Sequence, residues 1–180
     1  YPERNAILAR YLTMFSEKKG VDIYDRNYNL PDNPNLFPPE YSDFILGSLP
    51  PEQIEVAYKG YNYGLNMCTV TQSNTMFARR VFELGASNTL VVSNYSLGLH
   101  HYFGDLVICT DDMREADDAF EQLFTGLNAR RMRLLMLRKV LREHLYEDRM
   151  DRIVHIVFGV HLKRALPDVY IVDVRSEEHT

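Results

Sequence analysis

The segment from residue 66 to residue 83 carries the side chains best suited to hold an anionic ligand. A polar loop over 68–74 follows an expected strand at 61–67 and leads into an expected helix over 75–86. Ligands of open parallel sheets bind beyond the carboxyl ends of the strands, where helix N-termini present free N–H groups. Hydroxyls and backbone amides of such a turn can hold a diphosphate. The polar candidates are Asn66, Thr69, Ser73 and Thr75.

Two arginines and a glutamate follow this loop and complete the candidate site. Arg79 and Arg80 are expected one turn inside the helix, where a guanidinium could bind a phosphate through two hydrogen bonds. Glu83 lies one turn beyond Arg79, and its carboxylate could accept hydrogen bonds from two ribose hydroxyls. The spacing alone favours an alternative, in which Arg79 and Glu83 form an i, i+4 surface pair.

Two further charged residues are weaker candidates. Arg4 stands just ahead of the first expected helix and could contact a phosphate. Asp25 ends the expected strand at 21–24, a place where an acid can bind ribose in dinucleotide-binding folds. The Gly-rich turn of those folds does not precede it, so a solvated loop is favoured for Asp25.

The expected helix over 129–145 has an unusual run of basic residues. It has two interpretations, nucleic-acid binding or a solvated helix face, and the acidic balance of the chain favours the second. The basic residues are Arg130, Arg131, Arg133, Arg138, Lys139 and Arg142, with no acid before Glu143. Apolar residues fill the other positions: Met132, Leu134, Leu135, Leu137, Val140 and Leu141.

The sequence contains no recognisable metal or nucleophile motif. The six histidines have no metal-ligand spacing with cysteine or carboxylate partners. G-x-S-x-G, Walker and C-x-x-C patterns are absent from the sequence. We therefore expect no metal and no cofactor, and no complete catalytic machinery in these residues.

Composition places the chain among ordinary globular domains. Its 180 residues are 46% hydrophobic and 25% charged, which favours a packed core over disorder. Lys and Arg number 20 against 25 Asp and Glu, which argues against electrostatic wrapping of nucleic acid. Two cysteines and the lack of a long apolar run predict a cytoplasmic protein without a transmembrane segment.

The order of expected elements predicts the fold class. Strands at 21–24, 42–46, 61–67, 89–93 and 105–109 alternate with helices at 5–18, 50–58, 75–86 and 96–103. This alternation predicts an α/β fold, a Rossmann-like parallel sheet flanked by helices. Three expected helices at 113–125, 129–145 and 147–160 form a helical C-terminal flank.

The block over residues 65–94 resembles the CgeB-like (spore-maturation type) glycosyltransferases, members of the larger GT-B set. Its most specific parts are 75–84, TMFARRVFEL, and 86–94, ASNTLVVSN. Shorter supporting stretches are 23–26, 58–61, 103–105 and the pattern His144-x-Tyr146-x-x-Arg149. The resemblance extends over nearly all of residues 2–163.

The resemblance implies two Rossmann-like domains with a cleft between them. This chain would be most of the C-terminal half, which holds the nucleotide-sugar donor. Glu83 matches the glutamate that binds the donor's ribose, and Arg79 and Arg80 match paired arginines that face the diphosphate. Asn66, Thr69 and Ser73 line the loop before them.

One position departs from the family pattern. Many retaining relatives carry a sugar-binding glutamate eight residues before Glu83, where this chain has Thr75. The identity of the sugar, and retention or inversion of its configuration, are therefore open. Asn88 also replaces a frequent glycine, at modest cost if its φ is positive.

We expect residues 1–163 to be a donor-binding domain that lacks its N-terminal part. Residues 164–174 are expected to be a linker with the first strand of a following domain, and 175–180 a non-native tail. The partners would be a nucleotide sugar, an unknown glycan, protein or small-molecule acceptor, and the N-terminal GT-B half. Such a fragment would bind donor without metal but would not turn over alone.

Two other functions are open at this stage. The first is a non-catalytic GT-B-like module retained for partner binding or assembly, with which Thr75 in place of an acid is consistent. The second is a sugar-nucleotide epimerase on a similar architecture.

Overall fold

A computed structural model describes residues 2–18, 20–28, 30, 37–124 and 127–162. The chain divides into two compact units, one ending at Glu143 and one beginning at His144. The expected linker over 164–174 and the expected tail over 175–180 lie outside the described residues. Among the described residues, no helix has the length and apolar character needed to cross a bilayer.

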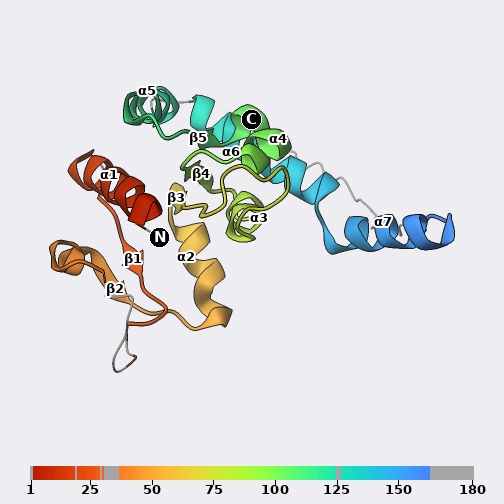
Figure 1. The fold of residues 1–180 in the computed structure, drawn as a ribbon, viewed down its shortest axis with the longest axis horizontal. Coiled ribbons are helices and arrows are strands. Elements are labelled where there is room, and N and C mark those ends of the chain that lie inside the picture. The colour runs from red at the N-terminus through yellow and green to blue at the C-terminus, as the bar shows by residue number, and fades with distance from the viewer. Residues whose placement is uncertain (1, 19, 29, 31–36, 125–126, 163–180) are drawn as a thin grey trace, which may run out of the picture. The chain divides into compact units, whose positions relative to one another are not determined.

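The first unit contains a three-stranded parallel sheet in the order β3-β4-β5 (Figure 1). The strands are β3 (Tyr63–Asn66), β4 (Leu90–Ser93) and β5 (Ile108–Cys109). They are joined by α3 (Arg80–Ala86), α4 (Leu97–Phe103) and a 3-10 turn (Gly104–Leu106). The predicted α/β fold with a Rossmann-like parallel sheet is confirmed.

A second, two-stranded parallel sheet is formed by β1 (Ile23–Tyr24) and β2 (Ile45–Gly47). Before it comes α1 (Pro2–Lys18), and after it come a 3-10 turn (Pro51–Gln53) and α2 (Ile54–Gly60). The expected strand over 42–46 begins only at Ile45, because a 3-10 turn (Pro39–Phe44) occupies the preceding residues. The expected strand over 105–109 is likewise shortened by the turn that precedes β5.

Helices cover both faces of the larger sheet. Leu90 and Val92 of β4 pack with Tyr11 and Phe15 of α1 and with Phe120 of α5 (Met113–Phe124). Val91 points to the other face, whose cover comes from α3, α4 and α6 (Leu127–Glu143). All four residues of β4 are buried, as expected for a central parallel strand with both faces covered.

The second unit contains α7 (Tyr146–Phe158). Its first turn is held by the Asp148 carboxylate, which accepts a hydrogen bond from the Leu145 backbone N–H at 2.9 Å. It ends at Gly159, whose φ of 70° places it in the left-handed region. The expected helix over 147–160 is therefore confirmed to within two residues.

Close contact between β3 and α3 requires glycine at position 64. A Cβ at Gly64 would lie 2.6 Å and 2.8 Å from the two Cδ atoms of Leu84, which is itself buried. We predict that Gly64→Ala lowers the free energy of unfolding by about 1–3 kcal/mol, because an added methyl group overpacks a filled core. Urea denaturation followed by circular dichroism measures the change.

Gly60→Ala is the matched control, since a Cβ at Gly60 would meet no atom within 4 Å. It should leave stability unchanged or raise it by up to about 1 kcal/mol, because alanine restricts the unfolded chain. Equal effects of the two substitutions would contradict the packing argument.

Candidate functional site

The carboxyl ends of the three strands lie in one row. Asn66, Ser93 and Cys109 are the last residues of their strands, and they are in register across the sheet. The Asn66 side-chain N–H donates to the Ser93 hydroxyl at 3.1 Å and to the Cys68 sulfur at 3.3 Å. Asn66 and Ser93 are both fully buried, so this polar pair closes the sheet edge from inside.

Asn94 extends the pairing of β3 and β4 with its side chain. Its Oδ1 accepts a hydrogen bond from the Cys68 backbone N–H at 2.7 Å, and its Nδ2 donates to the Cys68 carbonyl at 3.1 Å. The Asn94 side-chain amide thus makes the two hydrogen bonds that a backbone residue of β4 would make to β3 if the strands were longer. It fixes the start of the loop that carries Thr69 and Ser73.

A third anchor comes from the opposite face of the sheet. The buried Tyr11 hydroxyl of α1 lies 3.1 Å from the Ser93 carbonyl oxygen and 2.7 Å from that of Thr110. Burial raises the pKa of the Tyr11 hydroxyl. The hydroxyl therefore stays protonated and acts as a hydrogen-bond donor. Tyr11 therefore joins the chain leaving β4 to the chain leaving β5.

The loop after β3 rests on α4. The Leu97 backbone N–H donates to the Thr71 carbonyl at 2.8 Å. A Cβ at Gly98 would lie 3.0 Å from the Ser73 carbonyl oxygen, so glycine permits this approach. The Ser73 hydroxyl in turn accepts the backbone N–H groups of Thr75 and Met76, at 3.4 Å and 3.1 Å.

The prediction that a helix begins at Thr75 is wrong. The helix α3 begins at Arg80, with Arg79 at its N-cap, so neither arginine lies one turn inside it. Two contacts explain the delay: the Ser73 turn occupies the N–H groups of residues 75 and 76, and Phe77 packs against Phe82 and Phe103. With seven residues, α3 provides less of a diphosphate cradle than the sequence predicted.

Glu83 is held between α3 and α2. Its Oε1 lies 2.6 Å from Arg79 Nε, and the Tyr58 hydroxyl donates to its Oε2 at 3.3 Å. The Glu83 side chain is 35% exposed, whereas that of Arg79 is 79% exposed. The structure thus contains the i, i+4 pair that the sequence offered as the alternative to ligand binding.

Arg80 contributes to the same group. Burial raises the pKa of the Tyr58 hydroxyl, the nearby Arg80 guanidinium opposes this shift, and the Glu83 carboxylate adds to it. Arg79, Arg80, Glu83 and Tyr58 therefore form one charged cluster on the α2–α3 surface.

The other predicted residues lie apart from this cluster. Asn66 belongs to the buried group with Ser93 and Asn94, while Thr69 and Thr75 are exposed in the loop. Arg4 lies in the first turn of α1 with its Nη2 3.4 Å from Asn5 Oδ1. In the hydrogen-bond network of the described residues, the α2–α3 cluster and the Asn66 group are separate.

Sequence reasoning missed three residues: Tyr11 and Asn94 at the strand ends, and Tyr58 in the α2–α3 cluster. Asn94 carries a local signal, a polar side chain directly after a continuous apolar strand. Tyr58 lies in one of the stretches that carries the family resemblance. Tyr11 has no such signal, because its partners are 82 and 99 residues away.

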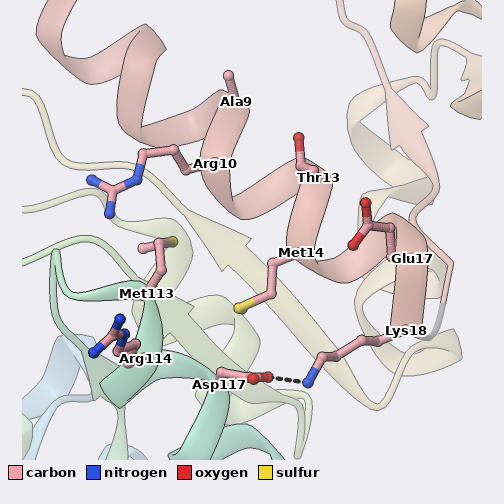
Figure 2. Close-up of a pocket in the computed structure, with 9 residues that line it drawn as sticks. All are labelled: Ala9, Arg10, Thr13, Met14, Glu17, Lys18, Met113, Arg114 and Asp117. Carbon is pink, nitrogen blue, oxygen red and sulfur yellow. Dashed lines mark hydrogen bonds and ion pairs between the residues drawn. The ribbon is translucent and has the colours of Figure 1, made fainter.

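A hollow of about 630 Å³ lies between α1 and α5 (Figure 2). Its walls include Arg10 and Met14 of α1 and Met113 and Arg114 of α5. Lys18 closes one end through ion pairs with Asp117 and Glu121. None of the eight predicted site residues lines this hollow, which lies on the α1–α5 side of the sheet.

No group of three His, Cys, Asp or Glu side chains suited to a metal ion occurs in the part of the chain that the structure describes. His161 Nδ1 lies 2.9 Å from Asp151 Oδ2 in the second unit, a side-chain contact of only two such groups.

We predict that Asn94→Ala lowers the free energy of unfolding by about 2–4 kcal/mol. The substitution removes two buried hydrogen bonds and leaves the Cys68 backbone groups without their partner. Chemical denaturation measures the loss. Asn74→Ala, an exposed position in the same loop, should change stability by less than about 0.5 kcal/mol, and a loss as large as that of Asn94→Ala would contradict the assignment.

A family model described as glycosyl transferase-like matches residues 22–155. No curated protein and no solved structure matches the chain. The matched range contains both the Asn66 group at the strand ends and the α2–α3 cluster.

Proposed function

Since the chain belongs to the glycosyl transferase-like family, we propose that it is the donor-binding half of a GT-B glycosyltransferase. In this proposal it is of the CgeB-like type and binds a nucleotide sugar. The proposal places the protein in the cytoplasm and the acceptor on the complementary N-terminal half. The family match over residues 22–155 carries the proposal.

The state of Glu83 supports its role as the ribose acceptor. Its ion pair with Arg79 is a surface i, i+4 pair, and such pairs contribute only about 0.3–0.5 kcal/mol. A ligand can displace Arg79 at that small cost. The hydrogen bond from Tyr58 keeps the carboxylate oriented at 35% exposure, so two oxygens are presented in a fixed direction to a diol.

The arginines supply charge for the leaving group. When the bond between the anomeric carbon and the phosphate oxygen breaks, negative charge develops on the nucleoside diphosphate. Arg79, once released from Glu83, and Arg80 are exposed guanidiniums on the same helix end. Positive groups that bind the diphosphate stabilise the transition state electrostatically, and the proposal assigns this role to the two arginines rather than to a metal.

One observation favours a second candidate, a non-catalytic GT-B-like module for binding or assembly. Thr75, which stands where many retaining relatives of the resembled family carry an acid, is exposed and lies five residues before α3 begins. No acid therefore stands at this position to contact a sugar.

We predict that the protein binds UDP or GDP, or one of their sugars, and that Glu83→Gln weakens this binding about 10- to 100-fold. The loss follows from replacing a charged acceptor of two ribose hydroxyls by a neutral amide. Arg80→Gln should weaken the binding of nucleoside diphosphates by a similar factor and leave the binding of nucleosides unchanged. Isothermal titration calorimetry measures both.

Glu55→Gln is the matched control, because Glu55 is likewise the carboxylate of an i, i+4 pair, with Lys59 at 3.3 Å. It should not change affinity. Unchanged binding by Glu83→Gln would remove the proposed site, and a protein that binds none of these nucleotides would favour the non-catalytic module.

A further inference from the structure

The outward side of α6 combines arginines with leucines. Met136 and Val140 anchor the helix in the core, on the side that faces α3 and β4. The opposite side is exposed, and we call it the arginine–leucine face. Its residues are Leu127, Arg130, Arg131, Leu134, Leu135, Arg138, Leu141 and Arg142.

Three of the leucines form a line along this face with arginines on both sides, while Leu135 lies on the same flank as Arg131, Arg138 and Arg142. Leu127, Leu134 and Leu141 recur every seven residues, which keeps them on one line of a helix with 3.6 residues per turn. Their exposed fractions are 84%, 42% and 47%. By the same geometry Arg130 lies on one flank, and the other three arginines lie on the opposite flank.

The positive charge of this face is not neutralised by neighbours. Residues 127–142 contain no acid. Within the described part of the chain, none of the four arginines of the face has an ion pair with a carboxylate. By contrast, Lys139 pairs with Glu143 at 2.7 Å and Arg133 donates to Asn62 at 3.0 Å, and both lie nearer the buried side.

We propose that the arginine–leucine face of α6 docks on the surface of an anionic lipid bilayer. A helix with an apolar line and cationic flanks lies in the interface, with its leucines at the boundary between headgroups and acyl chains. The arginines extend outward to the lipid phosphates. A single convex helix fits this partner because lipids rearrange around its leucines.

Two other partners fit the face less well. A second copy of the chain would bring four arginines against four more without an acid on either face, and like charges repel. A nucleic acid would neutralise the arginines but leave the leucines without a partner, and the face has no aromatic ring on which bases could stack. The lipid surface satisfies both kinds of side chain.

The inference is independent of nucleotide-sugar binding, because α6 contains none of the proposed donor-site residues. Its test is co-sedimentation of the protein with sucrose-loaded vesicles of phosphatidylcholine alone or with 30% phosphatidylglycerol. We expect binding to the mixed vesicles only, weakened by high salt because ions screen the attraction. Equal binding to neutral vesicles, or no binding to either, would overturn the proposal.

Variants assign the binding to the face. Replacing Arg131, Arg138 and Arg142 by Gln should lower the partition coefficient about a hundredfold, since each basic residue near an anionic surface contributes about a fivefold factor. The matched control replaces Arg26, Arg114 and Arg152 by Gln, three exposed arginines outside α6. It changes the net charge equally and should retain most of the binding.

A separate variant tests the contribution of the leucines. Leu134→Gln should weaken vesicle binding while leaving the far-UV spectrum unchanged, because its side chain lies outside the core. Equal losses in the two triple variants would show a nonspecific charge effect. Self-association in sedimentation velocity that Leu134→Gln abolishes, or RNA binding without vesicle binding, would replace the lipid surface by another partner.

Discussion

The burial of β4 on both faces is the constraint on which the rest of the first unit depends. Leu90, Val91 and Val92 are all at most 2% exposed, and they alternate between the α1–α5 cover and the α3–α4–α6 cover. Helices can approach this closely only where small residues stand at the contacts, as Gly64 does against Leu84 and Gly85 against Met136. Because helices cover both faces of the sheet, a ligand can reach it only at the ends of its strands.

The strand ends are therefore where polar side chains accumulate, but most of them serve the protein itself. Asn94 takes the place of a backbone residue beside Cys68, and Tyr11 joins the last residue of β4 to the first residue after β5. Buried polar groups must be hydrogen-bonded to avoid a desolvation cost. These side chains give the loop a fixed start, while the charged cluster around Glu83 is positioned separately by α2 and α3.

Local patterns predicted the elements whose determinants are local. The apolar run at 89–93 predicted β4, and Ser96 caps α4 by accepting a hydrogen bond from the Leu99 N–H. Asn88 has a positive φ of 57°, the backbone region in which glycine is the least strained residue. In each case the responsible residues lie within a few positions of one another.

The start of α3 was mispredicted because one of its two determinants, the packing of Phe77, is not local. Phe77 fits the helical spacing of Val81 and Leu84, so periodicity alone includes it in the helix. In the structure Phe77 packs on Tyr102 and Phe103 of α4, about 25 residues further along the chain. Tertiary aromatic contacts thus override a helical pattern, and they also set how far Thr75 lies from Glu83. The late start of α3 weakened the helix dipole argument for the diphosphate, whereas it left the charge argument based on Arg79 and Arg80 intact.

Helix α6 carries a local excess of positive charge that the negative net charge of the chain does not reveal. The net charge of −5 favoured a solvated face for this helix, with apolar residues at its remaining positions. The structure buries only Met136 and Val140 of that helix, so Leu134, Leu135 and Leu141 remain at the surface beside unpaired arginines. Exposure to water carries no free-energy penalty for the arginines, so a solvated face explains their position. It does not explain the line of leucines beside them. Exposed leucines scattered singly need no explanation; leucines aligned at seven-residue intervals and flanked by uncompensated positive charge are the combination that an anionic interface stabilises.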